Sequence, residues 1–403
     1  MFVLTEHPKA GKLRTPVHVW LPGMDDLEEG CLEQALHLSM FPWAIDRIAL
    51  MPDTHQGYGM PIGGVMATRE VVVPNAVGVD IGCGVAFCTT SLLWRDLSRP
   101  IVSRWVEAIL EQIPQGFSHH RDRHPADCIG QFQQVHPEEE EHKDLWKELD
   151  RGYYQMGTLG GGNHFIELQS DEEGRVCVMI HSGSRNLGYQ IAGYFNRTAQ
   201  NKRKEWKSPV PSSHQLDYLP VDSREGISYI RWMKLAREFA RENRKRMMER
   251  VAQVLGSNGM AVNIGLVTDV HHNDVNLETH QKKTLWIHRK GAIRAAKGEK
   301  GIIPGAMGLH SYVVEGLGNP ESFMSCSHGA GRAMSRKQAL KTRTSRDVVA
   351  ELEKKGVFLG KKKKGDVAEE AASAYKNIDF VIDQQQDLIR PLMRLEGRAV
   401  IKG

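Results

Sequence analysis

The sequence predicts an α+β protein of mixed architecture that is not a Rossmann fold. Short apolar runs with the β-branched character of strands lie at residues 44–51, 71–73 and 85–90. Two other segments, 98–113 and 230–255, place apolar residues at the 3.6-residue spacing of a helix with one buried side. Because strands and helices do not alternate regularly along the chain, a doubly wound parallel sheet is not expected.

The chain is expected to form one interwoven domain over residues 1–403. It has 403 residues, of which 40% are hydrophobic, so it can bury a substantial core. No internal repeat, Pro- or Ser-rich linker or break in composition divides it. The residues best suited to chemistry are spread from position 80 to position 328. The fold must therefore bring distant segments together.

The composition limits the cellular setting. Six cysteines at irregular spacing favour reduced thiols over a disulfide scaffold. No apolar run approaches the roughly 20 residues of a membrane helix, and residues 1–7 lack the pattern of a signal peptide. We therefore expect a cytoplasmic protein with no membrane partner. The formal net charge of +4 is only mildly basic, so nucleic-acid binding would need local clusters.

Four polar segments are assigned from composition. Residues 115–137 are irregular and histidine-rich, which is typical either of a solvated loop or of a loop whose Arg and His side chains contact nucleic-acid phosphates. Residues 138–150 predict an exposed acidic helix, and the basic face of the 230–255 helix is expected to be solvated. Four consecutive lysines at 361–364 predict a loop tip that is solvated or touches a nucleic acid.

A predicted hairpin brings two histidines together. Residues 165–168 and 176–180 are short β-type runs on either side of the turn sequence Ser-Asp-Glu-Glu-Gly. Centring the turn on its two glutamates places His164 directly opposite His181, with Cβ atoms roughly 5 Å apart. Two imidazoles at that separation suit shared metal chemistry, although two unrelated histidines would give the same pattern.

Two further segments offer metal ligands. Asp80 and Cys83 lie three residues apart among glycines, which let a carboxylate and a thiolate converge on one ion. A strand with a glycine kink would look the same. The second segment contains His271 and His272. Neighbouring side chains of an extended segment point in different directions, so only one of the two is expected to reach a given metal. One Asp, one Cys and three His exceed the needs of one tetrahedral ion and suit two ions with a bridging thiolate.

A candidate nucleophile lies in residues 323–336. His328 precedes a Gly-Ala-Gly turn and a helix-forming stretch, which predicts a position at a helix start. Free backbone N–H groups and the positive end of the dipole lie there. They favour the neutral, nucleophilic imidazole and can hold phosphate oxygens beside it. Such a histidine is suited to attack a nucleotide phosphate, and a plain helix cap in a glycine-rich loop is the alternative.

Six ordered segments carry a resemblance to a known family. They are MPDTHQGYGMPIGGV (51–65), GVDIGCG (78–84), GNHFIE (162–167), HSGSR (181–185), GIIPGAMG (301–308) and SCSHGAGR (325–332). These resemble the signature blocks of the RtcB family, the GTP- and manganese-dependent RNA-splicing ligases. The blocks follow the family's order and, with the terminal VIKG, extend from residue 51 to residue 403. The resemblance implies a mixed α/β architecture around a central metal and nucleotide cleft.

The resemblance implies individual roles at the metal site. His328 would attack the α-phosphate of GTP and carry GMP as a phosphoramidate, and Cys83 would bridge two Mn²⁺ ions. His272 is preferred over His271 because the family pattern places the ligand directly before the asparagine, here Asn273. The identity of the metal comes from the resemblance, since the affinity order alone would favour zinc. The implied metal ligands are Asp80, Cys83, His164, His181 and His272.

A GTP site and a substrate site are implied in the same way. Glu167 and Lys402 would recognise guanine, while Arg185 and Arg336 would bind an RNA phosphate. Many family members carry Ser where this chain has Ala306, so one hydroxyl contact with the nucleotide is missing. The implied GTP-binding residues are Asn163, Glu167, Asn273, Pro304, Gly305, Ala306, Met307, Ser311, Gly329, Ala330, Gly331 and Lys402.

The implied function is that of an RNA ligase. It would join RNA 3′-phosphate or 2′,3′-cyclic phosphate ends to 5′-hydroxyl ends, through GMP-histidine and an RNA 3′ end activated by GMP. The metal ligands alone would also suit a two-metal RNA phosphohydrolase or nuclease, but that enzyme needs neither a covalent nucleotide on His328 nor a guanine-binding Glu167. A non-catalytic RNA-binding protein would need neither a nucleophile nor metal ligands. Asp53 and His55 receive no role, and an activating protein partner is left open.

Overall fold

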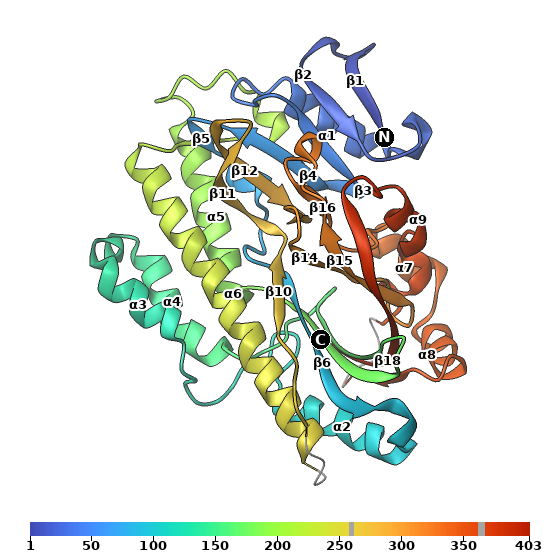
Figure 1. Ribbon diagram of the computed structural model, residues 1–403. Helices are drawn as coiled ribbons and strands as arrows, with labels where there is room; N and C mark the ends of the chain where they lie inside the picture. The colour runs from blue at the N-terminus through green and yellow to red at the C-terminus, as the bar shows by residue number, and fades with distance from the viewer. Residues whose placement is uncertain (258–261, 362–366) are drawn as a thin grey trace.

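Two large sheets form the framework of the protein (Figure 1). The computed structural model describes residues 1–257, 262–361 and 367–403. The first sheet orders β1 (Phe2–His7), β2 (Gly11–Val19), β3 (Ile48–Tyr58), β4 (Met60–Thr68), β12 (Lys283–Lys290) and β11 (Asn273–His280). The second orders β10 (Thr268–His271), β6 (Gly84–Leu93), β8 (Arg175–Ser182), β7 (Phe165–Ser170), β18 (Ile389–Lys402), β15 (His310–Gly316) and β14 (Lys300–Ile303).

Shorter strands and the helices complete the architecture. Strand β17 (Phe358–Gly360) pairs with β18, β13 (Ala292–Arg294) with β16 (Ser325–Ser327), and β5 (Val71–Val72) with β9 (Leu219–Pro220). The helices are α1 (Glu29–Ser39), α2 (Arg99–Gln112), α3 (Asp127–Val135), α4 (Lys143–Gln155), α5 (Arg185–Lys202), α6 (Arg224–Gly256), α7 (Arg336–Thr342), α8 (Ser345–Lys354) and α9 (Ile378–Asp383). Helices α5 and α6 pack together on one side, and α7 to α9 lie on the other (Figure 1).

The pairing of the strands confirms the predicted α+β class. Within the described residues, the ladders are antiparallel except for β2 with β3 and β17 with β18. Strand β18 at the end of the chain pairs with β7, and β12 joins β4 across more than 200 residues of sequence. This order excludes the doubly wound parallel sheet of a Rossmann fold. In the described part of the chain, no helix is both long and apolar enough to cross a membrane.

The predicted 98–113 and 230–255 helices are confirmed as α2 and as most of α6. Helix α6 begins after Ser223, whose side chain accepts a hydrogen bond from the backbone N–H of Gly226 at 3.0 Å. Its predicted apolar stripe is buried, including Phe239 and Val251. This stripe packs against α5, α3, β8 and β6, so α6 supports the sheet strands that lead into the candidate site.

The predicted register of the 165–180 hairpin is wrong by one residue. His181 pairs with Phe165, and His164 lies just before β7. The turn is one residue longer than expected, because Asp171 Oδ1 accepts hydrogen bonds from the backbone N–H groups of Glu173 and Arg175. These bonds fix an Asx-type turn that moves the hairpin centre toward the C-terminus.

Other local predictions were wrong in part. The first predicted strand begins at Ile48 rather than at residue 44, and α3 forms within the stretch expected to be irregular. The acidic 138–150 helix is divided at His142, and Glu139 is buried, where it accepts hydrogen bonds from α6. The basic face of α6 is not wholly solvated, because Arg244 is fully buried. The predicted tip at 361–364 lies mainly outside the described residues.

Candidate active site

A cleft of about 750 Å³ lies where the two sheets approach each other. Ile62 and Lys290 line it from the first sheet, and Phe165, His181 and Lys402 line it from the second. Nearly all the residues implied by sequence line this one cleft. Those lining it are Asp80, Cys83, Asn163, Glu167, His181, His272, Asn273, Pro304, Gly305, Ala306, Met307, His328, Gly329, Ala330, Gly331, Arg336 and Lys402. His164, Ser311 and Arg185 lie behind its wall.

Sulfur, imidazole and carboxylate groups converge at one end of the cleft. Cys83 Sγ lies 3.4 Å from Nε2 of His164 and 3.3 Å from Nε2 of His181. Asp80 Oδ2 lies 2.9 Å from the same nitrogen of His164. The His272 ring continues the cluster, with its centroid 5.2 Å from that of His181. The register error therefore did not separate the two hairpin histidines, whose ring centroids are 5.4 Å apart.

This donor set fits a metal site. Cys83, His164 and His181 place one ligand atom each within 4.8 Å of one another. Burial lowers the pKa of His181 and of His272 well below the usual value, and neighbouring histidines lower it further, so both rings are neutral and have lone pairs for a cation. Burial and then Asp80 raise the pKa of the Cys83 thiol, a cost that a coordinated cation reverses. These buried groups make a metal-binding cluster.

Helix α6 positions the loops that carry the cluster. The buried Arg244 donates from NH1 to the carbonyl groups of Gly82 and Ser182, both at 2.9 Å. Its other nitrogens form a two-point ion pair with Asp269 at 2.6 and 2.7 Å. Gly82 precedes Cys83, and Ser182 follows His181. One guanidinium therefore joins the neighbours of Cys83 and His181 to the same helix.

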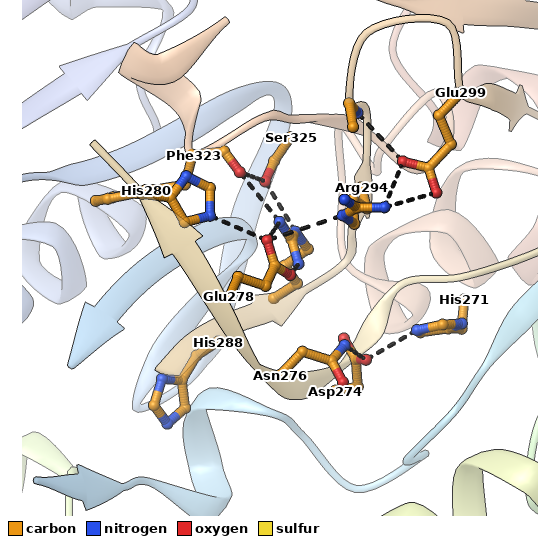
Figure 2. A network of polar contacts seen from close by, with 12 residues as sticks. His271, Asp274, Asn276, Glu278, His280, His288, Arg294, Glu299, Phe323 and Ser325 are labelled. Carbon is orange, nitrogen blue, oxygen red and sulfur yellow. Dashed lines mark hydrogen bonds and ion pairs between the residues drawn. The ribbon is translucent and has the colours of Figure 1, made fainter. Parts of the chain in front are cut away.

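The two adjacent histidines of residues 271–272 point to different partners. His271 ends β10, and its Nε2 lies 2.8 Å from Oδ2 of the buried Asp274, as Figure 2 shows. His272 faces the metal cluster and lies beside His328, with ring centroids 4.7 Å apart. The extended backbone at the junction of β10 and β11 explains the alternation. The geometry thus places His272, and not His271, with the other candidate ligands.

His328 is held by a strand and a carboxylate, and its predicted position at a helix start is wrong. It follows β16, and α7 begins only at Arg336. Oδ2 of Asp53, a fully buried residue of β3, lies 2.7 Å from His328 Nδ1 and accepts from the backbone N–H groups of His328 and Gly329 at 3.1 and 3.3 Å. With the proton on Nδ1, Nε2 keeps its lone pair. Asp53 therefore orients the ring through Nδ1, whereas the helix dipole was expected to favour the neutral imidazole.

The charge of Asp53 is favoured by its surroundings. Burial raises the pKa of this carboxyl, but His328, His55 and Lys376 outweigh burial and hold the pKa below its usual value. The carboxylate is therefore ionised at neutral pH and can stabilise positive charge on the His328 ring. The sequence contained a signal for this role in the glycine-rich 51–65 block, but it did not indicate which residue Asp53 would contact.

A second buried ion pair fixes the strand before His328 (Figure 2). Arg289 of β12 pairs with Glu278 of β11 and donates to Ser325 Oγ at 2.8 Å and to the Phe323 carbonyl at 3.0 Å. Burial raises the pKa of Glu278, but Arg289 and His280 outweigh it and lower the pKa to about 2. The charged pair thus joins the first sheet to β16 and limits movement of the residue that follows it.

The cleft also contains a buried carboxyl group. Glu167 of β7 accepts a hydrogen bond from Gln169 Nε2 at 2.6 Å. Burial raises the pKa of Glu167 to about 8, although Gln169 and Lys402 act in the opposite direction. Gln169 also donates to Ser311 Oγ, which accepts from the Gly305 N–H at 3.0 Å. Ser311 therefore supports the 304–307 wall from behind rather than lining the cleft.

Several cationic residues lie in or near the cleft. Lys402 Nζ lies 3.2 Å from Oε2 of the buried Glu370, a partner that the sequence did not indicate. Arg336 is half exposed at the cleft, whereas Arg185 is largely buried behind it. Lys290 was also missed; its Nζ donates to the carbonyl groups of Tyr58 and Asn75, and burial lowers its pKa to about 7.

Comparison with known proteins relates this geometry to a family. Residues 34–403 match the profile of the family described as tRNA-splicing ligase RtcB. The chain is 36% identical to the RNA-splicing ligase RtcB of Escherichia coli, covering 96% of this chain and 97% of that protein. It is 33% identical to the RNA-splicing ligase RtcB of Mycobacterium tuberculosis, over 92% of this chain and all of the other. For the tRNA-splicing ligase RtcB of Thermococcus kodakarensis the identity is 32%, over 93% and 92% of the two chains.

Proposed function

The chain belongs to the RtcB family and is an RNA ligase, and we propose that it joins 3′-phosphate or 2′,3′-cyclic phosphate ends to 5′-hydroxyl ends with GTP and two Mn²⁺ ions. The proposal takes residues 1–403 as a single ligase domain acting in the cytoplasm. The observation that carries it is the pairing of His328 with Asp53 beside the metal-binding cluster. One cleft then contains the candidate nucleophile His328 with its carboxylate partner Asp53 behind it, the metal-binding cluster, and the buried carboxyl group of Glu167.

In the first step, Nε2 of His328 attacks the α-phosphorus of GTP. A P–N bond forms, the bond to the β-phosphate oxygen breaks, and pyrophosphate leaves. Asp53 stabilises the positive charge that develops on the ring, because its Oδ2 lies 2.7 Å from Nδ1. The Gly329-Ala330-Gly331 segment lines the cleft beside the ring, and its backbone would approach the nucleotide phosphates.

Asp80, Cys83, His164, His181 and His272 would hold the two Mn²⁺ ions, which would supply positive charge to polarise phosphate P–O bonds. Support comes from the convergence of a thiol with imidazole nitrogens at 3.3 and 3.4 Å in a buried cluster. Glu167 and Lys402 would recognise guanine, since Glu167, ionised once the guanine N–H groups donate to it, accepts from groups that adenine lacks. Ala306 offers no hydroxyl at this wall of the site.

The later steps transfer GMP and then displace it. An oxygen of the RNA 3′-phosphate attacks the phosphorus on His328, and the P–N bond breaks, which frees the imidazole. The 5′-hydroxyl of the second RNA then attacks the activated 3′-phosphorus, loses its proton and expels GMP. A cyclic phosphate must first add water to become a 3′-phosphate. Arg336 at the cleft and Arg185 behind it would bind and position this phosphate.

Labelling with radioactive GTP tests the proposal. With α-labelled GTP and Mn²⁺, the native protein should acquire acid-labile label, and His328→Ala should not. His310→Ala is a matched control, because His310 is also paired with a carboxylate at 2.7 Å, that of Asp379, but does not line the cleft. RNA with 3′-phosphate and 5′-hydroxyl ends should be sealed. Label on His328→Ala, or RNA cleavage without any labelling, would refute the ligase mechanism and favour the phosphohydrolase alternative.

A further inference from the structure

The segment between α2 and α3 displays an aromatic side chain to solvent. Phe117 has a relative exposure of 105%, the highest of any large hydrophobic residue in the described part of the chain. Its neighbours are polar, in the sequence Ser-His-His-Arg-Asp-Arg-His at 118–124. The ring contributes nothing to the core, and both of its faces are free to stack on a ligand.

Contacts of the preceding residue place this aromatic ring close to the cleft. The N–H of Gly116 donates to the Gly160 carbonyl at 2.9 Å, and Arg185 NH2 donates to the Gly116 carbonyl at 2.6 Å. The glycine loop that begins at Gly160 continues directly to Asn163, which lines the cleft, and to the metal cluster. Phe117 therefore follows a residue anchored both to the wall of the cleft and to an arginine proposed to bind RNA phosphate.

The residues that follow Phe117 contribute to a second cavity lined by cationic groups. A cavity of about 240 Å³ is lined by His120, His124, Arg246 and Arg250, with a carboxylate from Glu249. Arg246 is partly neutralised because it pairs with Glu242 at 3.3 Å and lies 3.8 Å from Glu249.

Two arginines on this surface are not neutralised. Arg121 and Arg250 are exposed and form no hydrogen bond or ion pair with any residue that the structure describes. By contrast, Arg123 in the same loop pairs with Asp150 at 3.1 Å and stacks on Tyr153. Asp122 is the carboxylate within the loop that opposes this charge. Arg121 lies four residues after Phe117, and Arg250 lines the cavity with His120 and His124 of the same segment. An exposed aromatic ring and free guanidinium groups are the combination that binds bases and phosphates of single strands.

We propose that Phe117, Arg121 and Arg250 bind the single-stranded RNA next to the end that is joined, with Phe117 stacked on a base and the arginines against phosphates. The inference rests on the proposed ligase function and extends it to the recognition of substrate. The partner is RNA rather than protein because the free charge is positive and the segment is hydrogen-bonded, through Gly116, to the glycine loop that leads into the cleft. Stacking on a phenyl ring accepts any base, so this contact favours unpaired RNA without selecting a sequence.

Binding of labelled RNA tests the inference separately from the chemistry. The probe is a fluorescein-labelled single strand of about ten nucleotides with a 3′-phosphate, and the readout is the dissociation constant from anisotropy. Phe117→Ala should weaken binding about tenfold, the effect of losing one stacked base. Phe117→Trp should retain binding, whereas Phe117→Leu should not. The Arg121→Ala, Arg250→Ala double variant should weaken binding and reduce its dependence on salt.

Controls separate this surface from the catalytic cleft. Leu266→Ala removes another exposed apolar side chain, one that follows Gly265, whose N–H donates to Thr89 in the part of β6 remote from Cys83. That variant should bind RNA as the native protein does. Labelling of His328 by GTP should be unchanged in all these variants, because it needs no RNA.

Two results would overturn the inference. One is Phe117→Ala binding the probe as tightly as the native protein, which would leave the ring to another partner. The other is that Phe117→Ala loses both GTP labelling and RNA binding, which would show that Phe117 supports the fold. A native protein that binds RNA through Phe117 but acquires no label from GTP would refute the proposed function and leave the RNA surface intact.

Discussion

Replacing Asp53 with Asn tests how the candidate nucleophile is held. The Asp53 carboxylate is fully buried, and its Oδ2 lies 2.7 Å from His328 Nδ1 and accepts two backbone N–H groups as well. Asn preserves the shape and can keep an oxygen at that position. The substitution therefore removes the negative charge with little change in packing.

The size of the effect follows from the distance between the two groups. As Nε2 attacks a phosphate, the imidazole becomes positively charged 2.7 Å from the carboxylate oxygen. At an effective dielectric constant of about 20, two unit charges at that distance attract by roughly 6 kcal/mol, which is an upper limit. Aspartate-to-asparagine substitution beside a catalytic histidine in another enzyme lowers the rate about 10⁴-fold. We expect the rate of GMP transfer to His328 to fall by about 10²- to 10⁴-fold.

Single-turnover labelling with rapid quenching measures this rate directly. The dissociation constant of GTP should change little, since Asp53 does not line the cleft. Asp379→Asn is the matched control, because Asp379 Oδ1 lies 2.7 Å from His310 Nε2 in a similar pair. That variant should label at the native rate. A labelling rate for Asp53→Asn within threefold of the native rate, with unchanged melting temperature, would refute the assigned role.

Three other outcomes are expected. Cys83→Ala should lose both Mn²⁺ ions, because the thiolate is shared within the cluster, and should therefore lose GTP labelling. Elemental analysis of the purified protein measures the metal content, and a native content in this variant would contradict a bridging role. Glu167→Gln should reduce the preference for GTP over ATP in labelling, since the carboxylate no longer accepts from guanine; an unchanged preference would place guanine recognition elsewhere. The same variant should melt higher than the native protein without ligand. The folded-state pKa of Glu167 is about 8, above the ordinary value, so the native protein loses stability as pH rises from about 4.5 to 8. At pH 8 the variant should therefore be more stable than the native protein by at least about 1 kcal/mol. Equal melting temperatures at pH 8 would count against the raised pKa of Glu167.

Local pattern was sufficient for part of this fold and of the site. The apolar period of residues 230–255 predicted α6, and alternation along an extended segment separated His271 from His272. The hairpin of β7 and β8 was also predicted, but its register depended on Asp171, whose hydrogen bonds to the turn backbone add a residue. A side chain that competes with the ladder for backbone groups gives no signal in the apolar pattern.

The sequence by itself determined which chemical groups this protein has and the family to which it belongs. Its ordered glycine-rich blocks identified His328, Cys83 and Glu167 as candidate site residues. Only the tertiary structure decided what holds these groups. Asp53 and His328 are 275 residues apart, and Lys402 meets a Glu370 that no motif marks. Such contacts form where two sheets and a helix pack together, and residue periodicity records which side of an element is buried but not which distant partner it meets.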